Sequence, residues 1–177
     1  MKITILSYSR TGRNEALALS LASALSAEHI KIKEKKNRSY FSIGLDILFN
    51  RIPKIDLKLK DKNEIILFIA PVWLGKVAFP LRACLKELQE KPRSYAFISL
   101  SGGGDGALSN PGLALELEKR TGRKPEFVMN FHIADFLPAN PKPSPGEIEK
   151  YQITEKEIQE LTNKIAAKVK AVFFKKL

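Results

Sequence analysis

The amino-acid sequence predicts an α/β fold: a doubly wound, five-stranded parallel sheet with helices on both faces. Short apolar segments alternate with longer segments of helical periodicity along the chain, and this alternation is typical of a parallel sheet built from β-α-β units. The apolar runs at 64–70 and 95–100 are nearly continuous, as expected for strands that are covered on both faces. We expect the strand order 2-1-3-4-5.

Five segments are expected to form the strands of this sheet. The second segment is short and alternates apolar with basic residues, which favours a position near a sheet edge. The segments are Ile3–Leu6, Ile30–Ile32, Glu64–Ala70, Tyr95–Leu100 and Glu126–His132.

Helices are expected between the strands and after the last one. Pro80 fits the first turn of one helix, and Pro111 and Gly122 fit the start and the end of another. The segment Thr154–Glu157 is typical of a capping box at the start of the last helix. One stripe of that helix is apolar and is expected to pack on the core: Ile158, Leu161, Ile165, Val169 and Val172.

Two segments fall outside this alternation. Tyr40–Ile52 is expected to form an added amphipathic helix that ends at Pro53, and Pro138–Gly146 to form an extended surface loop stiffened by prolines. No internal repeat and no second core are evident, so residues 1–177 are expected to form a single domain.

The composition fits a soluble, cytoplasmic protein. At 177 residues the chain is long enough to bury roughly 70% of its unfolded surface. Its single cysteine, Cys84, excludes an internal disulfide framework. The chain starts without the features of a signal peptide, and no apolar run approaches the ~20 residues of a membrane span. We therefore expect no membrane partner, and either a monomer or a homodimer.

The formal net charge of +11 is unusual, and much of it falls in one stretch. Ten Lys or Arg and four acidic residues lie between Lys31 and Lys62. Such a stretch attracts nucleic acid, acidic proteins or phosphorylated ligands, but its simplest interpretation is a solvated basic face. No zinc-ligand spacing or aromatic RNA-binding motif accompanies it, so we do not expect a nucleic-acid partner.

The segment Ile5–Glu15 carries the strongest functional signal. A strand runs through a small, hydroxylated loop into a helix, and the unpaired N–H groups and dipole of a helix N-terminus attract an anion. Ser9 and Thr11 can donate hydrogen bonds, and Gly12 allows close approach of the backbone. The residues expected to bind a phosphate are Ser9, Arg10, Thr11, Gly12, Arg13 and Asn14. The alternative is an ordinary polar turn in which Thr11 or Asn14 caps the helix.

Two further loops are expected to meet this one. They are Pro71–Lys76, after the third strand, and Ser99–Gly106, after the fourth. In an open parallel sheet, ligands bind at the carboxyl ends of the strands, where the strand order reverses. For the order 2-1-3-4-5, the loops after strands one, three and four lie at that point.

Together the three loops resemble those of the flavodoxin family. Ser9, Thr11 and Gly12 match the family's phosphate loop, Ser/Thr-x-Thr-Gly-Asn-Thr, and the next two residues depart from it. Pro71–Gly75 is similar to the segment that the family places beside the flavin ring, and the small residues of Ser101–Gly106 resemble the loop at the ring's polar edge. The resemblance covers nearly the whole chain. It implies a flavodoxin-like fold with FMN as the cofactor.

The resemblance also implies roles around the flavin ring. Trp73 is expected to stack or edge-pack on the ring, and Ser101 and Asp105 to hydrogen-bond its polar atoms. The residues expected to contact the ring are Pro71, Val72, Trp73, Leu74, Gly75, Ser101, Gly102, Gly103, Gly104 and Asp105. The alternatives are a core tryptophan under a loop and, for the glycine-rich segment, a flexible turn.

Other chemical side chains indicate no separate site. His29 and His132 are too few and too far apart in the chain for a metal site, and Cys84 is expected to be inert core. No Ser-His-Asp set or paired carboxylates stand out, so no catalytic residue is assigned.

Two classes of function remain open. The first is an FMN-binding redox protein that transfers electrons or reduces a quinone-like acceptor with NAD(P)H. The basic charge and the lack of an aromatic residue in the third loop favour the reductase, with NAD(P)H or an acidic redox protein as partner. The alternative is a flavin-free interaction or scaffold protein, which the departures at Arg13 and Asn14 keep open.

Overall fold

A five-stranded parallel sheet forms the centre of the molecule. The computed structural model describes residues 2–32, 65–73, 75–90, 93–102 and 110–174. The sheet has the order β2-β1-β3-β6-β7, and all its neighbouring strands are parallel. Its strands are β1 (Ile3–Ser7), β2 (Glu28–Lys31), β3 (Ile65–Ile69), β6 (Ser94–Ser101) and β7 (Val128–His132). The predicted fold class and strand order are confirmed.

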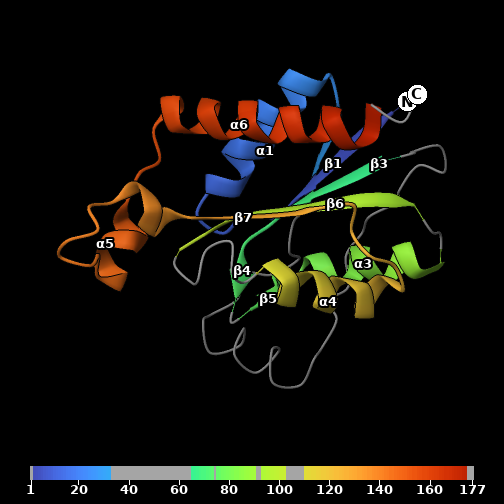
Figure 1. Cartoon of the computed structure of the whole chain (residues 1–177), viewed down its shortest axis with the longest axis horizontal. Helices are drawn as coiled ribbons and strands as arrows, with labels where there is room; N and C mark the ends of the chain where they lie inside the picture. The colour runs from blue at the N-terminus through green and yellow to red at the C-terminus, as the bar shows by residue number, and fades with distance from the viewer. Residues whose placement is uncertain (1, 33–64, 74, 91–92, 103–109, 175–177) are drawn as a thin grey trace.

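Helices cover both faces of the sheet (Figure 1). On one face α1 (Arg13–Leu25) packs beside α6 (Glu155–Val169), and on the other α3 (Leu81–Glu90) packs beside α4 (Asn110–Thr121). The shorter elements are the antiparallel pair β4 (Val72–Trp73) and β5 (Lys76–Val77), η2 (Ile133–Phe136), α5 (Pro145–Lys150) and η3 (Lys170–Phe174). Among the described helices, none has the length and apolar character needed to span a membrane.

The alternating faces of the strands divide the core between the two helical layers. β3 is buried along its whole length, which explains its continuous apolar run. Leu67 belongs to the core formed with Leu17 of α1 and Ile165 of α6. The next residue, Phe68, points the other way and belongs to the core that contains Leu81 of α3. The central strand thus supports helices on both sides, as a doubly wound sheet requires.

The predicted ends of α4 and the start of α6 are found where the sequence places them, whereas Pro80 directly precedes α3 instead of lying in its first turn. Gly122 follows α4 with a φ of 73°, and its N–H donates to the carbonyl of Glu118 at 2.8 Å. Thr154 and Glu157 form the predicted capping box of α6. These ends satisfy backbone groups that a helix terminus otherwise leaves without partners.

The structure differs from the sequence-based expectation in several places. Ser101, expected in the loop after the fourth strand, is the last residue of β6. Pro138–Gly146 is not a loop throughout, because Pro145 and Gly146 already belong to α5. A second capping box starts α5 within this proline-rich segment: the Ser144 side chain accepts a hydrogen bond from the N–H of Glu147. The β4–β5 pair was also not expected. The helix expected over Tyr40–Ile52 lies outside the described residues.

Candidate functional site

A cavity of about 640 Å³ lies at the carboxyl edge of the sheet. This volume is in the range typical of small-molecule sites. The cavity is bounded by the loop after β1, the start of α1, the segment after β3, the end of β6, and α5. Its lining residues are Arg10, Thr11, Arg13, Asn14, Pro71, Val72, Trp73, Leu100, Ser101, Gly102, Pro145, Ile148 and Glu149.

The cavity brings together residues from all three predicted ligand loops. Nine of the lining residues were predicted from the sequence: Arg10, Thr11, Arg13, Asn14, Pro71, Val72, Trp73, Ser101 and Gly102. Ser9, Gly12 and Gly75 lie in the same loops but do not line the cavity. Leu74, Gly103, Gly104 and Asp105 lie outside the described residues. The cavity therefore joins loops that are far apart in the sequence, at the predicted edge of the sheet.

The loop after β1 contains a hydroxyl without a hydrogen-bond partner among the described residues and leads into a helix without a side-chain cap. Gly12 is the N-cap residue of α1, with a left-handed φ of 85°, and no side chain caps the helix. The Oγ atom of Ser9 is buried without a hydrogen-bond partner in the described part of the chain. A buried hydroxyl without a partner is costly, and a helix N-terminus carries a partial positive charge. The loop thus has the donors and the dipole that suit an anion.

Asn14 joins this loop to the end of β6. Its amide Nδ2 donates to the carbonyl of Leu100 at 2.8 Å, and its Oδ1 accepts from the N–H of Leu100 at 2.9 Å. The side chain is only 3% exposed. Because both bonds go to one residue of β6, Asn14 ties the start of α1 to the end of that strand, and so joins two walls of the cavity.

Ser101 makes a similar connection to the segment after β3. Its Oγ accepts from the N–H of Val72 at 2.9 Å and lies 2.6 Å from the Oγ of Ser99. Gly75 stands in the β4–β5 turn with a φ of 71°. The turn brings Trp73 to the cavity, where its ring packs edge-on against Tyr8 with the centroids 6.0 Å apart. Trp73 is half-buried and contacts Tyr8 edge-on in the cavity wall.

Arg13 reaches away from the loop that carries it. Its Nη2 lies 3.0 Å from the carbonyl oxygen of Ile148, 2.6 Å from that of Glu149 and 2.7 Å from that of Tyr151. Partial burial lowers the pKa of the Arg13 guanidinium, and the nearby Glu149 carboxylate opposes this shift. The guanidinium, expected from the sequence beside a phosphate, is bonded to the C-terminal end of α5.

The α5 wall, made by Pro145, Ile148 and Glu149, was missed by the sequence reasoning. Its signal was present as the Ser-x-x-Glu pattern at 144–147, which the surrounding prolines obscured. Leu100 was missed because it belongs to the apolar run of β6.

Other titratable side chains lie in separate places. His29 Nε2 is 2.7 Å from Ser7 Oγ, and burial lowers the pKa of this histidine. His132, at the end of β7, is 3% exposed, and its ring nitrogens have no hydrogen-bond partner among the described residues. Cys84 is buried. The described residues contain no group of three His, Cys, Asp or Glu side chains that could hold a metal ion.

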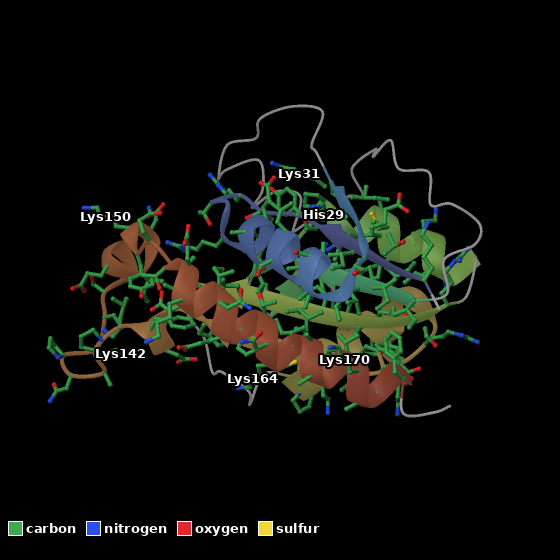
Figure 2. All side chains as sticks on the ribbon, turned by 90° about the horizontal axis from the view of Figure 1, so that it is seen from above. His29, Lys31, Lys142, Lys150, Lys164 and Lys170 are labelled. Carbon is green, nitrogen blue, oxygen red and sulfur yellow. The ribbon has the colours of Figure 1, made fainter. Side chains whose placement is uncertain are left out.

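Basic side chains are spread over several parts of the molecule. Lys31, the first residue of the predicted basic stretch, pairs with Glu15 at 2.6 Å between Nζ and Oε2. Residues 33–62 lie outside the described part of the chain. Lys164 Nζ lies 5.5 Å from the ring centroid of Phe131. Figure 2 shows further lysines before α5, at its end and at the start of η3: Lys142, Lys150 and Lys170.

The fold is shared with flavoproteins of known structure. A flavoprotein in complex with FMN from Lactobacillus acidophilus is 23% identical, with a TM-score of 0.59 over 74% of this chain and 91% of that one. A proposed flavoprotein from Bacteroides eggerthii is 15% identical, with a TM-score of 0.62 over 93% and 98%. A flavodoxin from an archaeon is 18% identical, with a TM-score of 0.50 over 96% and 99%. No protein-family model and no curated protein sequence matches the chain. The chain therefore has a flavodoxin-like fold.

Proposed function

We propose that this chain binds FMN in the cavity at the carboxyl edge of the sheet and acts as a flavodoxin-like redox protein. The observation that carries the proposal is the meeting of three ligand-type loops around a cavity of about 640 Å³. The flavoprotein from Lactobacillus acidophilus, whose structure contains FMN, has the same fold. Because a fold alone does not determine function, the proposal depends on whether the residues of the cavity suit the phosphate and the ring of FMN.

The loop after β1 fits the phosphate of FMN. Ser9 Oγ has no partner among the described residues, and the N-terminus of α1 has no side-chain cap. Thr11, in the same loop, lines the cavity. A phosphate would accept hydrogen bonds from these donors and would be stabilised by the helix dipole. We assign Ser9, Thr11 and the first N–H groups of α1 to phosphate binding.

The segment after β3 and the end of β6 fit an aromatic ring. An apolar wall of the cavity is formed by Pro71, Val72 and Trp73. Gly102 also lines the cavity and, having no side chain, leaves space for a ring. When bound, FMN supplies the redox chemistry by exchanging one or two electrons. This chain's own residues hold the ring and exclude water from the apolar wall. The Ser101 hydroxyl keeps the wall in place through the N–H of Val72.

Within this function, we favour reduction of a quinone-like acceptor with NAD(P)H over one-electron transfer. Trp73 is the one aromatic side chain among the described lining residues. A ring covered by a single aromatic side chain leaves room for a nicotinamide or an acceptor to stack. The net charge of +11 suits the phosphates of NAD(P)H, and it equally suits an acidic redox protein.

The flavin-free alternative loses its main support when Arg13 is considered. That alternative rests on the departures at Arg13 and Asn14, and Arg13 would support it if its bulk closed the phosphate loop. The guanidinium is instead bonded to three carbonyl groups of 148–151, and the cavity remains open beside it.

The first test is the visible spectrum of the purified protein, with mass analysis of the acid-released chromophore and an FMN titration of the stripped protein. We expect a flavin spectrum and one FMN per chain. NAD(P)H oxidation with and without a quinone then separates the two roles, because a carrier turns over little NAD(P)H. A folded protein that neither retains nor binds FMN would refute the proposal.

A further inference from the structure

α5 is a short, exposed helix that nevertheless forms part of the cavity wall. It lies at the end of the molecule to which β7 runs (Figure 1), and it has no buried residue. Pro145, Ile148 and Glu149 line the cavity. A Cβ atom added to Gly102 would lie 3.4 Å from Cγ2 of Ile148, so the end of β6 and α5 are in close contact.

An isolated helix of this length is not stable in water, because its nucleation cost is not repaid by so few hydrogen bonds. α5 therefore depends on what holds its two ends. At the N-terminal end, Ser144 and Glu147 form a capping box. At the C-terminal end, Arg13 lies within 3.0 Å of the carbonyl oxygens of Ile148, Glu149 and Tyr151.

The position of Arg13 has an electrostatic explanation. As the first residue of α1, it would place a cation at a helix N-terminus, where the dipole disfavours positive charge. Its side chain instead carries the charge to the C-terminal end of α5, where carbonyl groups lack helical partners and the dipole favours a cation. The same residue thus leaves the N-terminus of α1 free for an anion and stabilises α5.

We propose that Arg13 is a positioning residue that holds α5 as a wall of the flavin cavity, and that it does not bind the phosphate. In this arrangement Pro145 and Ile148 contact the ring portion of the ligand. The proposal deepens the proposed function and rests on it for the identity of the ligand. The bonds between Arg13 and α5 stand independently of that identity.

The two possible roles of Arg13 differ in their dependence on the ligand's phosphate. If Arg13 held the phosphate, its loss would weaken FMN binding and leave riboflavin, which lacks the phosphate, unaffected. If Arg13 holds α5 against the ring portion of the ligand, its loss weakens the binding of FMN and of riboflavin by the same factor. The ratio of the two dissociation constants therefore distinguishes the roles.

The experiment measures FMN and riboflavin binding to the full chain for four variants. We expect Arg13→Gln to raise the dissociation constants of FMN and of riboflavin equally, by roughly tenfold. This is the usual effect of losing a hydrogen bond to a charged group. Ser144→Ala, which removes the opposite cap of α5, should also weaken both. Thr11→Val should weaken FMN alone. Lys124→Gln, an exposed residue in the turn before β7, removes the same charge and should change neither.

Hydrogen exchange provides a readout that needs no ligand. The amides of residues 148–151 should exchange faster in Arg13→Gln and in Ser144→Ala, and at the wild-type rate in Lys124→Gln. FMN-specific weakening in Arg13→Gln, or unchanged exchange in these amides, would overturn the proposal. If the wild-type chain binds neither ligand, the proposed function and the ring-wall role both fail. The exchange rates then decide separately whether Arg13 holds α5.

Discussion

Adjacent residues at the start of α1 fix two different walls of the cavity, and they do so in different ways. Asn14 is buried and makes both of its bonds to Leu100 in the sheet. Arg13 is half-buried and makes its bonds to the exposed helix α5. Consecutive helical residues point in different directions, so one helix start can hold both walls.

We therefore expect the two walls to differ in stability. The β6 wall is part of the buried sheet, and its opening requires disruption of the core. The α5 wall depends on one capping box and on Arg13, so we expect it to open while the sheet stays folded. Regions of low local stability are often those that admit ligands. We therefore expect changes at Asn14 to alter global stability and changes at the α5 wall to alter ligand binding.

The largest effect is expected from Asn14→Ala. The substitution leaves the N–H and the carbonyl of Leu100 without their present partners in a buried site. We expect the free energy of unfolding to fall by roughly 2–4 kcal/mol, as measured by urea denaturation. Asn163→Ala, on the exposed side of α6, is the matched control and should change it by less than about 0.5 kcal/mol. Equal effects of the two substitutions would mean that Asn14 does not hold the β6 wall.

A smaller effect is expected at Gly12, the N-cap residue of α1. Gly12 has a φ of 85°, although a Cβ there would meet no atom within 4 Å. Gly12→Ala should therefore destabilise the chain by about 1–2 kcal/mol through backbone strain alone. Gly112, which lies in α4 with equally open surroundings, has no positive φ. Gly112→Ala should stabilise the chain by up to about 1 kcal/mol, so thermal melting should shift the two variants in opposite directions.

The smallest effect is a dependence of the α5 wall on acid. Hydrogen bonds from Ser144 hold the pKa of Glu147 below its usual value of 4.5. As the pH falls, the Glu147 carboxylate is therefore protonated in the unfolded chain before it is protonated in the folded chain. The stability that the capping box contributes is present above about pH 4.5 and is lost as the pH falls through the lower pKa of the folded state. Hydrogen exchange in α5 should accelerate below that pH relative to β6, because the Asn14 bonds involve no titratable group. Equal acceleration in both elements would contradict the unequal stability of the walls.

The sequence predicts the sheet and the position of three loops at its carboxyl edge. The apolar run of β3 predicts a strand covered on both faces, and the Thr154–Glu157 pattern predicts the start of α6. These signals are local, and the carboxyl edge follows from the topology. Nine cavity residues could be named for this reason.

The α5 wall could not be predicted to the same extent. Its helix has a local signal in Ser144 and Glu147, but its position depends on Arg13, which lies 135 residues before Ile148. A contact over that separation has no periodic pattern in the sequence. The charge of Arg13 indicated an anion nearby, whereas the structure provides the carbonyl groups of a distant helix end.

The most direct test of the proposed site is the fluorescence of Trp73, the single tryptophan of the chain. Bound flavin should quench an indole in the same cavity, so we expect FMN titrated into the stripped protein to quench most of the emission at one equivalent. Riboflavin should give the same final quenching at a weaker affinity, because it lacks the phosphate. Stoichiometric FMN binding without quenching would place the flavin elsewhere, and the absence of both would contradict the FMN site itself.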